Sequence, residues 1–446
     1  MSRMPPTEVH LRSASRVDGV FTVPGDKSIS HRAAILGAFA DGVTEISGFV
    51  HNLDCDATLA CVEALGASVS DDGGLLRITG TTCEPVPGGT VTLDARNSGT
   101  TVRLLAGAVA SRPVSARLTG DDSLRRRPME RVARPLRLMG ADVETTAGCA
   151  PIVVRGRSVL TAIDYVPETP SAQVKSATLL AGLAANGCTR VDERVRTRDH
   201  TERMLAQFGA DTGTDERGAW VVGPARLRPS RVDVPGDFSS AAFLIGLGLL
   251  VDGEGIRITG VGLNPTRTRL LDILDDLGAR LTVTSTSDPG AEPSGDVTVR
   301  RSELLGARDG RMFEVGPELV SEIIDEVPIL AVIGSQTIGG IRFCGAADLR
   351  AKESDRIAAI AEGLGRMGAE VRTTRDTLEV RGQARLHGAR ISSWGDHRIV
   401  MAFACAAMCA SGTTIIESPE ASAVSFPGFF SCLPSGSVDW SHDVPC

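Results

Sequence analysis

Six stretches of the chain are apolar on nearly every side when they are drawn as helices. Each is rich in Ala, Leu, Val and Ile and ends near a Gly turn, after which a strand-like segment follows. Helices that are hydrophobic all round are buried ones, because surface helices keep a polar face. The pattern therefore predicts six buried helices, in SISHRAAILGAFADG, SGTTVRLLAGAVAS, SAQVKSATLLAGLAANG, SSAAFLIGLGLLVDG, DEVPILAVIGSQTIGG and GDHRIVMAFACAAMCASG.

A second series of helices, amphipathic rather than apolar, interleaves with the first. Each one is followed by Leu, Met or Phe, then Gly-Ala, then a strand-like segment. Because Gly accepts positive φ without strain, we expect this Gly to end each helix. The signal occurs in ALGASV, LMGADV, QFGADT, DLGARL and RMGAEV, and the strands expected after the buried helices read GVTEISG, SARLTG, GCTRVDE, GIRITG, GIRFCG and GTTIIES.

These elements form one repeating unit: strand, helix, strand pair, helix and strand, copied six times with the last copy less regular. VPGDKS starts at residue 23 and VPGDFS at residue 234, so the two halves begin alike. Internal repetition of this kind predicts two similar domains of three units each. We expect residues 23–234 to form an inserted domain. Residues 1–22 and 235–446 would form a discontinuous domain, whose sheet would include EVHLRSA.

Composition narrows the class of protein. The chain has 446 residues, of which 42% are hydrophobic and 23% charged, as in soluble globular proteins of two or three domains. The net charge of −8, with one Tyr and three Trp, disfavours nucleic-acid binding but is compatible with a small anionic ligand. The start has no signal-peptide pattern, and no apolar run is long enough to span a membrane. The 10 Cys contain no Cys-x-x-Cys, which favours reduced thiols in a cytoplasmic protein without a metal site.

Polar and charged residues gather where the buried helices begin. Ser, Asp and Asn are ordinary N-caps, and capping alone accounts for DFSSAA, which brings no cation. A cation at a helix N-terminus is unfavourable unless an anion binds there. If the helices of a domain run parallel, these ends form an anion site. The residues concerned are Lys27, Ser28, Arg32, Asn97, Ser98, Thr100, Ser171, Gln173, Asp325, Glu326, Asp396, His397 and Arg398.

Seven segments resemble, in chain order, the 5-enolpyruvylshikimate-3-phosphate synthase family: PGDKSISHR, NSGTTVRLL, DDSLRRRPM, SAQVKSA, IDEVPIL, LRAKESDR and GDHR. The resemblance implies an α/β fold of two similar domains, each of three βαββαβ units with buried parallel helices, in the form of an inside-out α/β barrel. It places the active site in the interdomain cleft. It also implies transfer of the enolpyruvyl group of phosphoenolpyruvate to the 5-hydroxyl of shikimate 3-phosphate, with release of phosphate and without a cofactor.

The resemblance implies a set of ligands for shikimate 3-phosphate. The planar guanidinium of Arg32 suits the carboxylate of this substrate. Asp325 and Lys352 resemble the pair that contacts and activates the 5-hydroxyl. Some relatives have Ser in place of Ala172, so here the backbone N–H would bind. The whole set is Lys27, Ser28, Arg32, Ser171, Ala172, Gln173, Arg198, Asp325 and Lys352.

For phosphoenolpyruvate, the resemblance places Arg127 on the phosphate and Arg356 with Arg398 on the carboxylate. Arg125 and Arg126 are interpreted as solvated. The implied ligands are Lys27, Asn97, Gly99, Arg127, Gln173, Arg356 and Arg398, and the implied catalytic residues are Lys27, Asp325 and Glu353.

The implied catalytic residues have different roles in proton transfer. Lys27 and Glu353 are the two candidates for protonation of the methylene carbon, and a carboxylate that stays ionised among cations suits a base. His397 is expected to orient or cap. In one departure from the family, ASAVSFPGFF puts Glu420 or a neighbour where some members bind phosphate with Lys.

Other functions remain open at this point. UDP-N-acetylglucosamine enolpyruvyl transferase has the same architecture, but its catalytic Cys loop has no match here. A divergent homologue could act on shikimate 3-phosphate by elimination in secondary metabolism. A binding protein on the same fold would have lost catalytic charges, which are present. The spacing of a P-loop is missing from PGDKS. We expect a monomer in the cytoplasm with two small anionic substrates and with no nucleic-acid or membrane partner.

Overall fold

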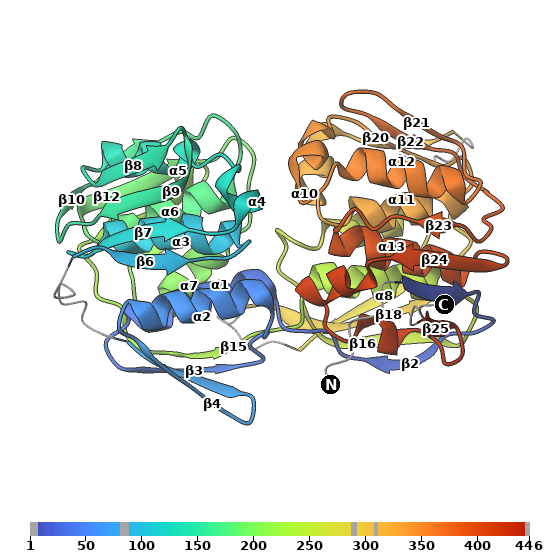
Figure 1. The fold of residues 1–446 in the computed structure, drawn as a ribbon, viewed down its shortest axis with the longest axis horizontal. Coiled ribbons are helices and arrows are strands. Elements are labelled where there is room, and N and C mark those ends of the chain that lie inside the picture. The colour runs from blue at the N-terminus through green and yellow to red at the C-terminus, as the bar shows by residue number, and fades with distance from the viewer. Residues whose placement is uncertain (1–7, 81–88, 287–291, 307–310, 442–446) are drawn as a thin grey trace, which may run out of the picture. The chain divides into compact units, whose positions relative to one another are not determined.

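The chain divides into two compact units in the computed structural model, which describes residues 8–80, 89–286, 292–306 and 311–441 (Figure 1). Unit 1 comprises Met1–Pro24, Gly236–Ser287 and Pro293–Cys446, and unit 2 comprises Gly25–Pro235 and Asp288–Glu292. Each unit has a hydrophobic core of its own.

Unit 2 contains three sheets that share one pattern, a parallel strand pair followed by antiparallel neighbours. The first has the order β15 (Arg231–Asp233), β3 (Val43–Ser47), β5 (Leu75–Thr79), β4 (Ser68–Asp72). The second has the order β6 (Val91–Asp94), β7 (Ser115–Thr119), β9 (Cys149–Arg155), β8 (Asp142–Thr146). The third has the order β10 (Leu160–Thr161), β12 (Ala185–Asp192), β14 (Gly218–Gly223), β13 (Thr212–Thr214), with β11 (Asp164–Tyr165) also paired to β12.

Unit 1 repeats this pattern twice and then varies it. Its first sheet has the order β2 (Asp18–Phe21), β16 (Gly255–Gly262), β18 (Ser294–Arg300), β17 (Arg280–Ser285). Its second has the order β19 (Phe313–Val315), β20 (Ile341–Phe343), β22 (Leu378–Val380), β21 (Val371–Thr373). In the third, β23 (Arg390–Ile391) pairs with β24 (Thr413–Glu417), and the strand pair is replaced by β1 (Glu8–Arg12) and β25 (Val438–Ser441). The less regular last copy therefore takes its strands from both ends of the chain.

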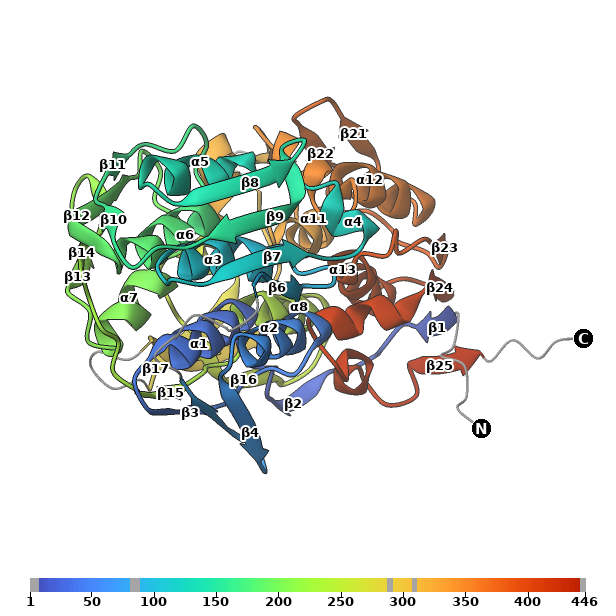
Figure 2. The ribbon, with the colours of Figure 1, turned by 60° about the vertical axis from the view of Figure 1, so that its left-hand side comes forward.

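Three inner helices pack against one another in each unit, and nearly all of their residues are buried. They are α1 (Lys27–Phe39), α3 (Gly99–Ala110) and α6 (Ala172–Gly182) in unit 2, and α8 (Phe238–Leu250), α11 (Val327–Gln336) and α13 (His397–Met408) in unit 1. The prediction of six buried helices is confirmed. A Cβ at Gly107 of α3 would lie 2.1 Å from the carbonyl oxygen of Ala177, so Gly107 allows α3 and α6 to approach closely. Figure 2 shows β7 and β9 over α3.

The outer helices end as their sequences predict. They are α2 (Leu53–Ala64), α5 (Glu130–Leu138), α7 (His200–Gln207), α9 (Arg269–Asp276) and α12 (Arg356–Arg366). Each is followed after one residue by a Gly of positive φ, between 82° and 102°: Gly66, Gly140, Gly209, Gly278 and Gly368. Short helical segments complete the fold, namely α4 (Asp122–Arg125), α10 (Pro317–Glu322), η1 (Ala347–Ala351), η2 (Pro419–Val424) and η3 (Phe429–Cys432).

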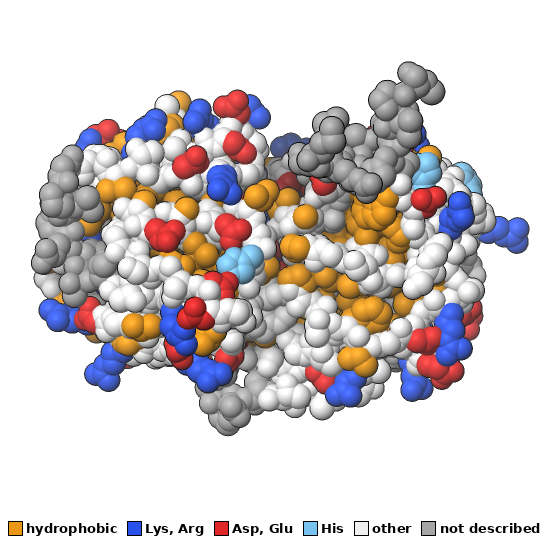
Figure 3. All heavy atoms as spheres, turned by 60° about the horizontal axis from the view of Figure 1, so that its bottom comes forward, with side chains coloured by type: hydrophobic (Ala, Val, Ile, Leu, Met, Phe, Trp, Pro, Cys, Tyr) orange, Lys and Arg blue, Asp and Glu red, His pale blue; other side chains and the backbone are white. Residues whose placement is uncertain are grey.

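The α/β class is confirmed, with one qualification about the barrel. The sheets of the described residues stay separate from one another, so their strands do not close a hydrogen-bonded barrel. Within the described ranges, none of the helices has the length and apolar character needed to cross a membrane. On the face drawn in Figure 3, Lys and Arg side chains are interspersed with Asp and Glu, without a continuous basic stripe among the residues described there.

Candidate active site

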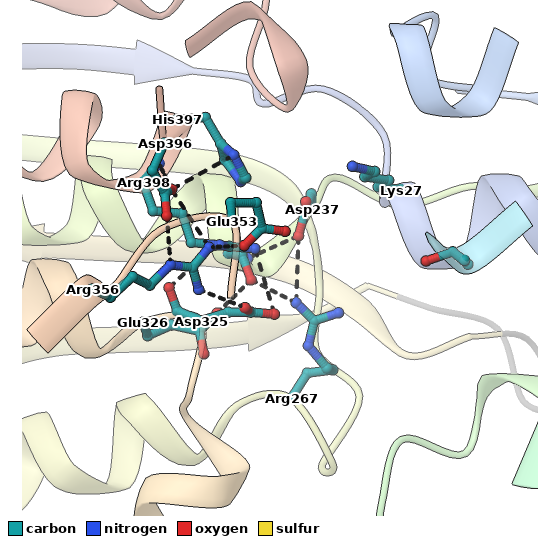
Figure 4. A network of polar contacts seen from close by, with 12 residues as sticks. Lys27, Asp237, Arg267, Asp325, Glu326, Glu353, Arg356, Asp396, His397 and Arg398 are labelled. Carbon is teal, nitrogen blue, oxygen red and sulfur yellow. Dashed lines mark hydrogen bonds and ion pairs between the residues drawn. The ribbon is translucent and has the colours of Figure 1, made fainter. Parts of the chain in front are cut away.

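In unit 1, charged side chains meet where α11, α12 and α13 begin (Figure 4). Asp396 caps α13, and its carboxylate accepts from the backbone N–H of Arg398 at 2.9 Å. Asp355 caps α12 in the same way, so Arg356 is the first helical residue. We call Asp325, Glu353, Arg356, Asp396, His397 and Arg398 the Arg356 cluster. All six were predicted to lie at the site or to cap its helices, and the structure brings them together.

Arg356 is completely buried and binds three carboxylates. Its Nε donates to Asp396 at 2.8 Å, its Nη2 to Glu353 at 2.7 Å and its Nη1 to Asp325 at 3.3 Å. All three guanidinium nitrogens therefore have protein partners. The predicted contact between Arg356 and a substrate carboxylate remains a prediction, and it requires the substrate to share or replace one of these partners.

Arg398 retains a donor for a ligand. Its guanidinium contacts Asp325 twice, at the backbone oxygen (3.2 Å) and at the side chain (3.5 Å). Within the described residues, its Nε is buried and has no hydrogen-bond partner. A buried donor left unsatisfied costs free energy, and an anion bound at this place would remove that cost.

The electrostatics of the cluster favour ionised acids and a neutral histidine. Burial has the largest single effect and raises the pKa of Asp396, but its neighbours, Arg356 first among them, together outweigh burial and hold the pKa below its usual value. Desolvation is also the largest effect on Glu353 and acts upward, yet the groups around it, Arg356 first among them, together lower its pKa to about 2. Burial, followed by the charge of Arg398, lowers the pKa of His397 to about 3. His397 is therefore neutral at pH 7.

Two predicted residues on one segment of unit 1 are exposed. Lys352 follows η1 and is exposed, as is Glu353, whose side chain is 39% exposed. Glu420 is exposed on η2 and is not among the residues of the Arg356 cluster.

The N-terminus of α8 carries a second network, which sequence reasoning interpreted as capping alone. Asp237 does cap α8, since it accepts from the N–H of Ser239 at 2.9 Å. The cation comes from elsewhere: buried Arg267 lies 3.5 Å from the Asp237 carboxylate and donates to Ser239 Oγ at 2.7 Å. Ser239 in turn donates to buried Glu326. Arg267 lies in the loop after β16, and no motif in the residues around it predicts a partner on α8.

In unit 2, the starts of α1, α2 and α3 hold the first group of predicted ligands. Lys27 Nζ lies 2.5 Å from a carboxylate oxygen of Asp54, which lies in the first turn of α2. The hydroxyl of Thr101 donates to the backbone oxygen of Asp54 at 3.4 Å and ties α3 to the same place. Asp26 caps α1, so Lys27 and Ser28 begin this helix, and both are partly exposed.

Arg32 is buried, and its hydrogen bonds are internal. The guanidinium donates to Thr201 Oγ1 at 2.7 Å, to Ser176 Oγ at 2.8 Å and to the backbone oxygen of Ser28 at 2.8 Å. Burial lowers the pKa of Arg32 to about 10. In this conformation Arg32 holds the Ser28 segment in place, and its direct contact with a substrate carboxylate stays a prediction.

The predicted phosphoenolpyruvate ligands of unit 2 are also brought together. Arg127 Nη2 donates to Asn97 Oδ1 at 2.6 Å. Gln173, in the first turn of α6, donates to Thr100 Oγ1 at 3.0 Å and accepts from Arg103 Nη1 at 2.7 Å. The N-terminal ends of α3 and α6 therefore lie side by side.

Arg103 is a residue that sequence reasoning missed. It is 6% exposed, and burial, followed by the charges of Arg131 and Arg127, lowers its pKa to about 9. A Cβ added at Gly99 would lie 2.9 Å from Nη1 of Arg103 and 3.3 Å from Nη1 of Arg127. A cation inside an otherwise apolar helix was the available signal, since a buried charge needs a partner.

The third inner helix of unit 2 starts with the predicted 3-phosphate segment. Ser171 caps α6, and Ala172 and Gln173 follow with partly exposed side chains. Arg198 is partly exposed in the loop between β12 and α7. The structure places helix N–H groups and a cation in this unit, as an anion site requires.

The predicted site residues cannot be recognised from the concavity of the protein surface alone. A surface groove of about 880 Å³ in unit 1 is lined by Arg311, Arg342, Arg381, Glu314 and Glu379, among others, and by none of the predicted site residues. In the part of the chain that the structure describes, no group of three or more His, Cys, Asp or Glu is arranged to hold a metal ion.

Sheets of a repeated pattern around buried helices, with ion-pair clusters at the helix N-termini, define an α/β protein of the enolpyruvyl transferase fold. EPSP synthase from Acinetobacter baumannii has this fold with a TM-score of 0.84 and 38% identity, over 95% of this chain and 97% of that chain. The enolpyruvyl transferase NikO from Streptomyces tendae shares the fold with a TM-score of 0.77 at 20% identity, over 98% of both chains.

Sequence comparison narrows the class to one family. The profile of EPSP synthase (3-phosphoshikimate 1-carboxyvinyltransferase) matches residues 11–433. The 3-phosphoshikimate 1-carboxyvinyltransferase of Koribacter versatilis is 44% identical over 95% of this chain and 98% of its own length. That of Gloeobacter violaceus is 45% identical over 95% and 97%. The chain belongs to the EPSP synthase family, and it is an enzyme, as the seven segments predicted.

Proposed function

We propose that this enzyme transfers the enolpyruvyl group of phosphoenolpyruvate to the 5-hydroxyl of shikimate 3-phosphate and releases phosphate, in the shikimate pathway of aromatic amino acid biosynthesis. The match of the family profile to residues 11–433 carries this conclusion, and relatives named for the same reaction support it. These relatives favour it over sugar-nucleotide transfer and over elimination.

Each unit contributes part of the binding groups in this proposal. In unit 2, phosphoenolpyruvate contacts Lys27, Asn97, Gly99, Arg127 and Gln173. Shikimate 3-phosphate contacts Lys27, Ser28, Arg32, Ser171, Ala172, Gln173 and Arg198 of the same unit. In unit 1, Arg356 and Arg398 hold the phosphoenolpyruvate carboxylate, and Asp325 with Lys352 contacts the 5-hydroxyl. The unsatisfied Nε of Arg398 supports an anion there.

Asp325 acts as the base in the proposed first step. Its carboxylate lies 3.3 Å from the guanidinium of Arg356 and 3.5 Å from that of Arg398. Asp325 takes the proton of the 5-hydroxyl, and the oxygen bonds to C2 of phosphoenolpyruvate.

The methylene carbon gains a proton in the same step, and the structure favours one of the two candidates. Glu353, with a pKa of about 2, is ionised at neutral pH and holds no proton to give. The ammonium of Lys27 has protons to donate. In the second step C3 returns a proton to the amine of Lys27 and the bond between C2 and the phosphate oxygen breaks, which gives the product and phosphate.

A coupled phosphate-release assay with both substrates tests the reaction. We expect phosphate release only when shikimate 3-phosphate and phosphoenolpyruvate are both present. In heavy water, deuterium should enter the vinyl group of the product during turnover. Product formed from shikimate 3-phosphate alone would show an elimination enzyme, and the transferase assignment would then be wrong.

Three further features remain proposals. We infer that the enzyme is a monomer, that it acts in the cytoplasm, in line with scattered Cys that form no Cys-x-x-Cys, and that it binds no nucleic acid, in line with the acidic net charge and the paucity of aromatic residues. Size-exclusion chromatography with light scattering tests the first of these, because a dimer would elute with twice the mass of 46.7 kDa.

A further inference from the structure

Lys175 is a buried cation that the proposed reaction does not use. It lies in α6, where residues 174–182 are all buried, and its side chain is 1% exposed. Lysine is almost never fully buried without partners, because desolvation of its charge is costly. At this depth Lys175 cannot touch a substrate, so its function lies in the residues that it holds.

The ammonium of Lys175 binds three oxygens from three places. Nζ lies 3.1 Å from the carboxylate of Glu193, 3.2 Å from the backbone oxygen of Thr197 and 2.7 Å from Glu202 on α7. The contacts with Glu193 and Thr197 are hydrogen bonds, and the contact with Glu202 is an ion pair. Both carboxylates are 4% exposed.

The side chain of Glu193 links the two ends of the loop between β12 and α7 by hydrogen bonds. Its Oε1 accepts from the backbone N–H of Thr197 at 3.0 Å and also from the Thr197 hydroxyl. The backbone N–H of Glu193 is held by the carbonyl of Arg217 at 2.8 Å. The loop residues 193–197 are therefore fixed at both ends, and Lys175 binds both ends at once.

The fixed end of this loop carries Arg198. Thr197 directly precedes Arg198, and consecutive Cα atoms are about 3.8 Å apart, so the placement of the Thr197 backbone sets the place of Arg198. Lys175 itself lies one helical turn from Ser171 and donates its N–H to the Ser171 oxygen at 3.0 Å. One buried side chain thus ties together the two segments proposed for the 3-phosphate.

We propose that Lys175 and Glu193 are positioning residues, which hold Arg198 in register with the start of α6 for the 3-phosphate of the substrate. This inference rests on the proposed function, because shikimate 3-phosphate is the ligand. Lys175 is unsuitable for the first test, because its removal would leave two buried carboxylates without their cation and would endanger folding. Glu193 and Thr197 offer milder changes.

The experiment measures the Kd of shikimate 3-phosphate by calorimetry, without phosphoenolpyruvate, together with the KM of both substrates and the Tm. Glu193→Ala removes the loop contacts and should raise the Kd about 10-fold or more, since hydrogen bonds to a charged group are lost. Glu193→Gln keeps the acceptor for Thr197 and should restore most of the affinity. Thr197→Val loses one hydrogen bond and should raise the Kd about fivefold. The KM of phosphoenolpyruvate should change less than about twofold in all three, since its ligands are untouched.

Thr145→Val is the matched control, because it removes a threonine hydroxyl on β8 that donates to a glutamate, Glu130, at 2.9 Å, in a different sheet of the same unit. It should lower the Tm as Thr197→Val does and leave the Kd unchanged. A folded Glu193→Ala or Thr197→Val protein with wild-type Kd would overturn the inference, as would an equal rise in both KM values. If wild type itself fails to bind shikimate 3-phosphate, the proposed function fails instead.

Discussion

Replacement of Arg127 by alanine separates the proposed transferase from an enzyme that uses shikimate 3-phosphate alone. In this structure the guanidinium donates to the neutral amide oxygen of Asn97 at 2.6 Å. No carboxylate of the described residues lies within ion-pair distance of it. The variant therefore leaves no buried acid unpaired, and its folding should survive. One lost hydrogen bond contributes about 1 kcal/mol net, which lowers the Tm by roughly 2 °C.

The effect on phosphoenolpyruvate should be far larger. A hydrogen bond to a charged group contributes about 1.5–3 kcal/mol, which corresponds to about 10- to 150-fold in kcat/KM. Arg103 lies nearby, but its guanidinium already donates to Gln173, so it does not substitute for the lost cation.

The assay follows phosphate release at varied phosphoenolpyruvate, with shikimate 3-phosphate binding measured separately. Arg126→Ala is the matched control, because this neighbouring arginine is exposed. We expect the control to behave as wild type and Arg127→Ala to bind shikimate 3-phosphate almost normally. Normal turnover by Arg127→Ala would refute the assignment of Arg127 to the phosphate.

Three further predictions concern Gly99 and two members of the Arg356 cluster. Gly99→Ala places a Cβ 2.9 Å from Nη1 of Arg103 and 3.3 Å from Nη1 of Arg127, and both atoms are ends of flexible side chains, so the protein should fold. Glyphosate resembles phosphoenolpyruvate in the arrangement of its charges, and its inhibition constant should rise more than the KM of phosphoenolpyruvate. Equal rises in steady-state kinetics would count against a selective steric effect. His397, whose pKa is about 3, should show neutral imidazole NMR shifts from pH 8 to pH 5, and titration near 6.5 would contradict its burial. Asp396 has a pKa below its unfolded value of 3.8, so its contribution to stability is complete above about pH 4 and lost as the pH falls through the folded pKa. Asp396→Asn should therefore be less stable than wild type by roughly 3 kcal/mol at pH 7 in urea unfolding, and a difference that does not shrink as the pH falls below about 4 would exclude this charge as its source.

The beginnings and ends of helices were predictable from the chain because they depend on neighbours within one turn. Asp26, Ser98, Ser171 and Asp396 each accept a backbone N–H two or three residues on, which requires only their own side chains. The five glycines after the outer helices adopt positive φ for an equally local reason. Resemblance to the family added the roles proposed for the charged residues, which local pattern did not supply.

The partners of the buried charges were not predictable in the same way. Arg356 binds carboxylates 31 and 40 positions away in the sequence, and Lys175 depends on Glu193 and on the backbone of Thr197. Arg267 supplies the cation that DFSSAA lacks, from a loop 28 residues beyond Ser239. Sequence alone determined that such cations, inside or beside apolar helices, must have partners, because burial of an unpaired charge is too costly. Only the tertiary structure decided which partners these are, since hydrogen bonds and ion pairs act over a few ångströms and packing alone brings distant segments within that range.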